Sequence, residues 1–352
     1  MTDERSPSPP ARAKPRPIHL VFGGVALAGM IAIAWARMGA LGLPSVPSNL
    51  DVNAAGLDGL YGLSADDAHI RPERLHDQSR EAPICPPCGC PVAAAHGYRN
   101  VKEGHIDTGL EELRSALRAA PTNLAVANVY RITMFELQRD FLREARKQGN
   151  LTPQFPPNLA DEPIRFFQEL CREHGTRETK LALALAWVDK MLLFPALEIK
   201  APSSVESVDI LTDILEHDPY YVPALFARGL NHLHRPARLV WPKAAETPID
   251  AAAQDIAKCV AIGRKVGAGS ARLQATLAIA LGDSYVKAGR LGVARSWWQI
   301  AQNLCGDDDL QQSIRRRYGW SDGEVLDRLE EELDRARAQL DRPMTDLAMM
   351  WN

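Results

Sequence analysis

The chain has 352 residues, of which 46% are hydrophobic and 24% are charged, and its formal net charge at pH 7 is -3. This length would hold two or three ordinary domains, or a single repeat array that grows by addition of units. Nearly balanced charge gives no case for a clustered basic face, so we do not expect nucleic acid as a partner.

The N-terminal residues predict a membrane anchor. Residues 1–17 are rich in Pro, Ser and Arg and are predicted to form a disordered tail. Residues 18–37 follow as the predicted transmembrane helix, and Ile18 to Ala36 carries no formal charge. As a helix this run would be roughly 28 Å long, close to the hydrocarbon thickness of a bilayer.

The charges around this segment predict its orientation. Three basic residues precede it closely and only Arg37 follows, which by the positive-inside rule keeps the N-terminus in the cytoplasm. We therefore expect a single-pass inner-membrane protein whose remaining chain is periplasmic in a Gram-negative cell. A cleaved signal peptide is the main alternative, because Ala34-Trp35-Ala36 is an A-x-A-like cleavage site, although the apolar run is longer than a usual signal core. A buried helix of a soluble protein is disfavoured by the basic, proline-rich flank.

Residues 38–84 have the composition of a linker, with several Pro, Gly, Asn and Asp residues. A cysteine cluster follows at Cys85, Cys88 and Cys90. Glycine rather than histidine follows the second cysteine, which excludes covalent c-type haem attachment. A disulfide is the first interpretation for an oxidising compartment. Two alternatives stay open: a zinc or other metal site completed by His96 or His76, and a thiol-redox pair.

Residues 85–340 predict a helical array, and residues 275–308 are its clearest unit. Gly282 leaves room for a neighbouring helix, and Gly289 permits the turn that reverses the chain. Small and aromatic residues recur at fixed spacing through both helices, at Gly282, Tyr285, Ala294, Trp298 and Ala301. This pattern resembles the tetratricopeptide repeat, although Ala278 stands where that family prefers tryptophan and Gly306 where it prefers proline.

Similar spacing occurs earlier in the chain. Residues 90–123 carry the pattern at Gly97, Gly104, Gly109, Leu113, Ala116 and Pro121. A split unit begins at Val222 with Gly229 and resumes, after an insertion at residues 234–248, with Ala252, Ile256 and Cys259. A degenerate second helix precedes it, with Ser207, Leu211, Ile214 and Pro219. Each such unit has an apolar face that it cannot bury alone, so the units are expected to stack into an α-solenoid.

Other helices are expected between these units. Leu124 to Lys147 reads as one long helix, and Lys180 to Phe194 as a buried one. Thr176 and Ser203 are predicted N-caps. His232 and His234 stand two residues apart near a helix end, and we interpret them as surface or packing histidines rather than metal ligands.

The resemblance to tetratricopeptide repeats implies a groove lined by the first helices of successive units. By that resemblance the groove residues are Tyr98, Val101, Lys102, Phe226, Leu230, Leu233, Ile279, Asp283, Val286 and Lys287. Their mostly apolar character suits an apolar or helical peptide of a partner protein. The implied function is a membrane-tethered scaffold that binds or assembles proteins outside the cytoplasm, without catalysis and without a cofactor. The alternative is a metal-binding or thiol-redox accessory protein that uses the cysteine cluster, for example in cofactor or cytochrome maturation.

The C-terminus predicts a cap and a tail. Residues 321–340 carry a charged, amphipathic pattern with an apolar stripe that includes Val325, Leu329 and Leu333, which suits the polar capping helix of a solenoid. Residues 341–352 form an apolar tail that would be costly to leave in water. We expect the tail to fold back onto the array, with docking into another protein as the alternative.

Overall fold

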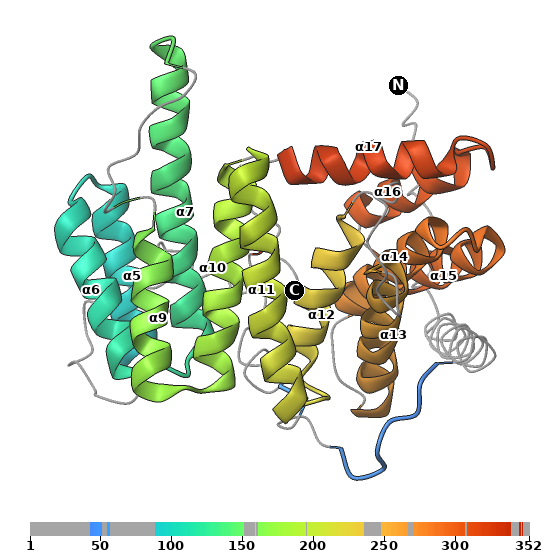
Figure 1. The fold of residues 1–352 in the computed structure, drawn as a ribbon, viewed down its shortest axis with the longest axis horizontal. Coiled ribbons are helices and arrows are strands. Elements are labelled where there is room, and N and C mark those ends of the chain that lie inside the picture. Colours follow the sequence, from blue (N-terminus) through green and yellow to red (C-terminus); the bar gives the residue numbers. More distant parts are fainter. Residues whose placement is uncertain are drawn as a thin grey trace, which may run out of the picture. The chain divides into compact units, whose positions relative to one another are not determined.

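The computed structural model describes residues 43–50, 55–56, 89–150, 159, 161–194, 196–235, 248–266, 271–306, 308–338, 345 and 347. Helices are the only regular elements in these ranges, which confirms the predicted all-α class for this part of the chain (Figure 1). The predicted tail at residues 1–17 and the predicted anchor at residues 18–37 lie outside the described residues. No helix among the described residues combines the length and the apolar character needed to cross a bilayer.

The described helices follow one another along the chain and mostly pack against their sequence neighbours. They are α5 (Gly89–Lys102), α6 (Ile106–Ala119), α7 (Leu124–Lys147), α9 (Glu162–His174), α10 (Arg177–Leu193), α11 (Leu197–His217), α12 (Val222–Leu233), α13 (Pro248–Val266), α14 (Ala271–Lys287), α15 (Leu291–Leu304), α16 (Asp308–Gly319) and α17 (Val325–Ala338). Four pairs make the closest contacts: α5 with α6, α10 with α11, α12 with α13 and α14 with α15. Stacked helix pairs are therefore the building unit of the fold.

Glycines set the close approach of the paired helices where the repeat pattern placed them. A methyl group added at Gly97 would lie 2.7 Å from the carbonyl oxygen of Gly109. One added at Gly282 would lie 2.5 Å from Nε1 of Trp298. At Gly229 the nearest atom would be Cγ1 of Ile256, at 2.8 Å. Since a larger residue at these positions would displace the facing helix or side chain, the close approach predicted from the pattern is confirmed.

The predicted turn and core positions also agree with the structure. Gly104 and Gly289, which reverse the chain within the first and last units, have φ values of 94° and 70°, a region that favours glycine. The returning helices bury their patterned residues, including Leu113, Ala116, Ala252, Ile256, Cys259, Ala294, Trp298 and Ala301. The hydrophobic pattern thus identified the buried face of each second helix.

The intervening helix α7 has the predicted bounds, whereas α10 begins three residues before the predicted Lys180 and ends one residue before Phe194. The helix α7 runs from Leu124 to Lys147, and at its start the side chain of Asn123 accepts hydrogen bonds from the backbone N–H groups of Ala125 and Val126. Its Tyr130 packs against Phe166 and Phe167 of α9, with ring centroids 5.0 Å and 5.7 Å apart. The predicted N-cap Thr176 begins α10 in the same way.

The predicted start of α11 is wrong. Ser203 is not an N-cap, because α11 begins six residues earlier, at Leu197, and continues through Pro202. The Ser203 hydroxyl instead donates to the carbonyl oxygen of Ile199, at 2.7 Å. A serine can satisfy its hydroxyl in this way inside a helix, so its presence alone does not mark a helix start.

Part of the predicted linker contacts the helical body. Ala55 is fully buried, and its carbonyl oxygen accepts a hydrogen bond of 3.0 Å from the backbone N–H of Val222. Gly56 has φ of 67° and lies directly against the ring of Tyr221. This short segment therefore attaches to the start of α12 rather than standing in solvent.

Candidate binding site

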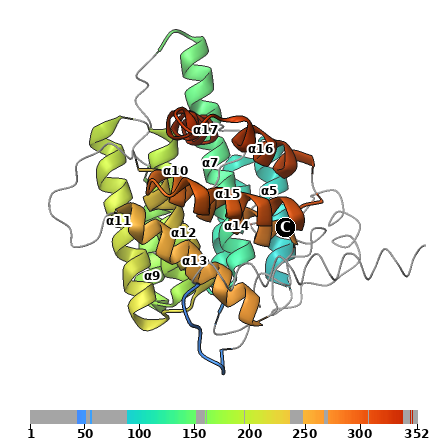
Figure 2. The same ribbon diagram turned by 90° about the vertical axis from the view of Figure 1, so that its right-hand side faces the viewer.

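The four predicted groove residues of the last unit lie inside the protein. Ile279, Asp283, Val286 and Lys287 on α14 are all buried, so the prediction that a ligand can reach them is wrong. For Asp283 and Lys287 the cause is that α16 and α17 pack against α14 and pair with these side chains. In Figure 1 α17 runs across the helix pairs, and in Figure 2 it is seen nearly end-on beside α16. The chain's own C-terminal helices thus occupy this part of the expected groove.

A buried charge network fixes α16 to α14. Arg317 donates from Nε and Nη2 to the two carboxylate oxygens of Asp283, at 2.8 Å and 2.7 Å. The indole of Trp298 donates to the same carboxylate at 3.0 Å. Burial by itself lowers the pKa of Arg317, but the charge and hydrogen bonds of Asp283 raise it above its ordinary value. Asp283 therefore serves an internal contact, and its position in the repeat pattern does not make it a ligand-binding residue here.

Lys287 fixes α17 in a comparable way. Its ammonium group donates to the carbonyl oxygens of Leu233 and Arg235, at 2.6 Å and 2.7 Å, and lies 2.8 Å from Glu330 of α17. The side chain is fully buried. Burial lowers the pKa of Lys287, although Glu330 opposes that shift.

The first unit keeps more of its predicted groove accessible. Lys102 is exposed, Tyr98 is half-buried and Val101 is buried. Lys102 lies 2.8 Å from Glu136 of α7, and its Nζ is 5.4 Å from the centre of the Tyr98 ring. Solvent therefore reaches Tyr98 and Lys102 but not the third predicted residue.

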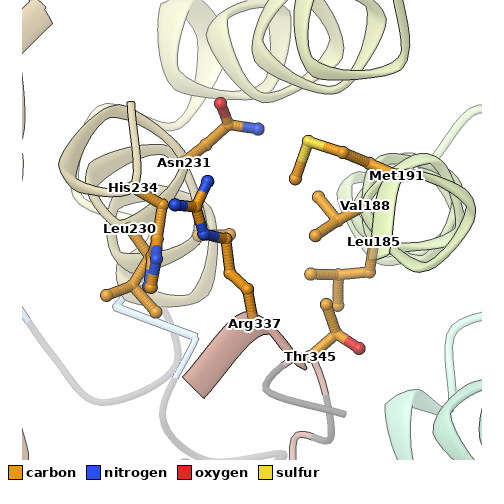
Figure 3. Close-up of a pocket in the computed structure, with 9 residues that line it drawn as sticks. Leu185, Val188, Met191, Leu230, Asn231, His234, Arg337 and Thr345 are labelled. Carbon is orange, nitrogen blue, oxygen red and sulfur yellow. The ribbon is translucent and has the colours of Figure 1, made fainter. Parts of the chain in front are cut away.

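The split unit contributes one predicted residue to a pocket. Phe226 and Leu233 of α12 are buried, which contradicts their expected exposure, whereas Leu230 is half-buried and lines a cavity of about 30 Å³. The helices α10 and α12, each the first of its pair, form the apolar wall of this cavity, with Arg337 and Thr345 contributed by the C-terminal part of the chain (Figure 3). The described lining residues are Leu185, Val188, Met191, Ala227, Leu230, Asn231, His234, Arg337 and Thr345.

Positive charge surrounds the polar side of this pocket. Burial lowers the pKa of His234 to about 3, and the charges of Arg337, Lys287 and Lys200 act in the same direction, so the imidazole is neutral at pH 7. Burial also lowers the pKa of Arg337 and that of Lys200. Figure 3 shows the guanidinium of Arg337 between His234 and Asn231 on one side and Met191 on the other. The pocket thus combines an apolar wall with one cationic side chain, that of Arg337.

Two described residues of the C-terminal segment, Thr345 and Leu347, contact the helical body, and Thr345 also lines the pocket. Thr345 is buried and its hydroxyl accepts a hydrogen bond of 2.9 Å from Arg131, while Leu347 donates its backbone N–H to Asn128 at 3.1 Å. Arg131 is also ion-paired with Asp189, to which Thr345 donates. The prediction that the apolar tail folds back onto the array is confirmed for Thr345 and Leu347.

The predicted metal or disulfide cluster lies largely outside the described residues. Nothing is described of Cys85 and Cys88, and of Cys90 only its backbone position in α5. His96 is exposed, with Nδ1 2.8 Å from a carboxylate oxygen of Glu112. The described ranges contain no group of three or more His, Cys, Asp or Glu side chains arranged to hold a metal ion. Within those ranges the remaining cysteines are free thiols, at Cys171, Cys259 and Cys305.

Sequence reasoning missed most of the pocket. The repeat position of Leu230 predicts its place in a groove, whereas the sequence around His234 indicates only a surface or packing histidine. Nothing in the local pattern of Arg337 distinguishes it from the other arginines of the capping helix. Its proximity to α12 depends on how α17 crosses the pairs, which no spacing within the sequence encodes.

Comparison with known proteins gives limited similarity. No family model matches the sequence, and no curated protein matches it. Among solved structures, the chain is similar to TTC0263, described as a thermophilic TPR protein in Thermus thermophilus. That similarity has 17% sequence identity and a TM-score of 0.40, and it covers 64% of this chain and 96% of the other. The described residues define an all-α protein of stacked helix pairs.

Proposed function

We propose that this chain is a protein-interaction scaffold of the tetratricopeptide-like class. The observation that supports this is the agreement between the repeat pattern and the packing of the helix pairs, above all the contact of Gly282 with Trp298 and that of Gly97 with Gly109. Stacked pairs of this kind present an extended surface formed by their first helices. The role requires binding and no reaction.

An accessible part of that surface lies in the first unit. Lys102 and Tyr98 lie on α5, and the Lys102 side chain is 43% exposed. An aromatic ring beside a cation suits a partner peptide that offers an apolar side chain and a carboxylate.

Quantitative affinity capture from solubilised membranes tests this proposal. The bait is the full chain, compared with Lys102→Glu and with Glu206→Lys, a charge change of the same size at an exposed position of the second helix α11. We expect at least one protein to be enriched by the parent chain and by Glu206→Lys, and to be lost with Lys102→Glu. Equal recovery with all three baits, or no specific protein, would contradict the proposal.

The proposed scaffold is tethered to the inner membrane by residues 18–37, with its helix pairs in the periplasm. The uncharged run and the basic residues before it support this arrangement. The test is fractionation followed by protease treatment of spheroplasts. The full chain should resist carbonate extraction and be digested from outside, whereas a chain that lacks residues 18–37 should be released. Protection of the helix pairs from external protease would show the opposite orientation.

A further inference from the structure

The pocket between α10 and α12 contains two buried polar atoms without a hydrogen-bond partner. Among the described residues, nothing pairs with Nδ2 of Asn231 or with Nδ1 of His234. Both side chains are more than nine-tenths buried, with 7% and 8% of their surface exposed. Asn231 uses only its oxygen, which accepts a hydrogen bond from Ser204 at 2.8 Å. Leaving a buried donor unpaired costs about 1–3 kcal/mol, so these atoms indicate a place for a ligand group.

The charge around these atoms specifies the kind of ligand group. Arg337 lies in the pocket, and its ion-pair partner Asp334 is exposed to solvent. None of the described lining residues is acidic. Lys200 and Lys287 add positive potential at His234. A cation is therefore disfavoured, while an anion with hydrogen-bond acceptors would accept from Arg337 and Asn231.

The apolar wall and the size of the pocket narrow the choice further. Leu185, Val188 and Met191 of α10 form one side, and Ala227 and Leu230 of α12 form the other. The cavity volume of about 30 Å³ is small, so only a short end group of a ligand enters it without movement of the walls. Phosphate or sulfate would leave the apolar wall without a partner, whereas a short alkyl chain would cover it.

We propose that this pocket binds a short, apolar monocarboxylate, whose carboxylate accepts hydrogen bonds from Arg337 and Asn231 and whose alkyl chain packs against Leu185, Val188 and Met191. The same chemistry has two sources: a free short-chain acid, or the C-terminal residue of a partner chain that ends in an apolar side chain. The proposal goes beyond the scaffold function and does not depend on it.

Calorimetric titration of the purified full chain tests the pocket with three kinds of probe. The free acid is 3-methylbutanoate, and its control is 3-methylbutanol, which has the same carbon skeleton without the charge. The third probe is a hexapeptide that ends in leucine, with a free or an amidated C-terminus. We expect the carboxylate forms to bind at least about tenfold more tightly than their uncharged controls, because the controls lack the charged, hydrogen-bonded contact of the carboxylate.

Two variants and a matched control locate the binding. Arg337→Met should weaken binding of the acid at least about tenfold, whereas Arg335→Met, an exposed arginine of the same helix, should leave it unchanged. Asn231→Asp is nearly isosteric and should abolish binding by repulsion, so it covers the case in which Arg337→Met fails to fold. Far-UV circular dichroism checks the fold of each variant.

The outcomes separate the two sources and can reject the proposal. Binding of the free acid alone identifies a small-molecule ligand, and binding of the peptide alone identifies a partner's C-terminus. Absence of binding by every probe, equal binding of acid and alcohol, or binding that is unchanged in Arg337→Met and in Asn231→Asp would overturn it. Partner capture by the Lys102 surface is measured separately, so failure of either proposal leaves the other standing.

Discussion

The first and last units place a lysine at the same repeat position in different environments. Lys102 of α5 and Lys287 of α14 each lie 2.8 Å from a glutamate of a later helix. The Lys102 side chain is 43% exposed, whereas that of Lys287 is fully buried and also donates to two carbonyl oxygens. The repeat pattern therefore predicts which face of a first helix points toward the groove. Whether that face stays accessible depends on the helices that follow in the chain.

The pKa directions of the two lysines reflect the same contrast. At Lys102 burial acts to lower the pKa, but the hydrogen bond and charge of Glu136 outweigh it and raise the pKa. At Lys287 burial prevails over Glu330 and lowers the pKa. The two ion pairs have equal length, but the pair in the first unit is a surface contact and the pair in the last unit is buried. They are therefore expected to contribute differently to the free energy of unfolding.

The largest effect is expected from Asp283→Ala in the last unit. This substitution leaves the Arg317 guanidinium buried without its carboxylate, which should cost about 3–5 kcal/mol of unfolding free energy. Urea denaturation followed by circular dichroism measures it. Substitution of both partners, as Asp283→Leu with Arg317→Met, removes the buried charges together and should recover most of the loss. A loss of unfolding free energy below about 1 kcal/mol in Asp283→Ala would contradict a buried ion pair that fixes α16 to α14.

The lysine pair gives the most direct test of the contrast. Lys287→Met should cost about 2–3 kcal/mol, because the carbonyl oxygens of Leu233 and Arg235 lose their buried donor. Lys102→Met should cost at most about 1 kcal/mol, since an exposed ion pair contributes little. Both values come from the same denaturation experiment. Equal losses would mean that coverage by α17 has no energetic consequence.

Glycine substitutions test the feature that the two regions share. Gly109→Ala brings a methyl group to 2.5 Å from the carbonyl oxygen of Gly97, and Gly282→Ala brings one equally close to Trp298. Each should cost about 1–3 kcal/mol by overpacking. Gly292 of α15 has open space at that point, so Gly292→Ala should be neutral or stabilise by up to about 1 kcal/mol. Thermal unfolding measures the stability of the three variants. Equal changes in all three would contradict the role of Gly109 and Gly282 in close helix packing.

These contrasts also explain which features of the fold and of the pocket could be predicted from the sequence. Small residues at fixed spacing predicted the contacts at Gly97 and Gly282, because close helix approach is a local steric requirement. The bounds of α7 were predictable from its continuous helical pattern, and the structure adds Asn123 as its N-cap. The exposure of Asp283 could not be predicted, since it depends on Arg317 from a helix that begins 25 residues later. The pocket depends on three segments distant in sequence, and for that reason its Arg337 was missed.

The smallest effect concerns histidines and pH. His234 has a folded pKa lowered to about 3 from an ordinary 6.5, so the unfolded chain binds a proton between these values and the folded chain does not. Stability is therefore complete above pH 6.5 and falls as the pH decreases through this window. Between pH 7 and pH 5.5 the loss of unfolding free energy due to His234 should be about 1.2 kcal/mol.

Urea denaturation at both pH values should show this loss reduced in His234→Gln. The comparison is His96→Gln, at an exposed position of the first unit, which should retain the loss due to His234. An unchanged pH dependence in His234→Gln would mean that the imidazole reaches solvent, and that α17 covers the pocket less completely than it covers Lys287.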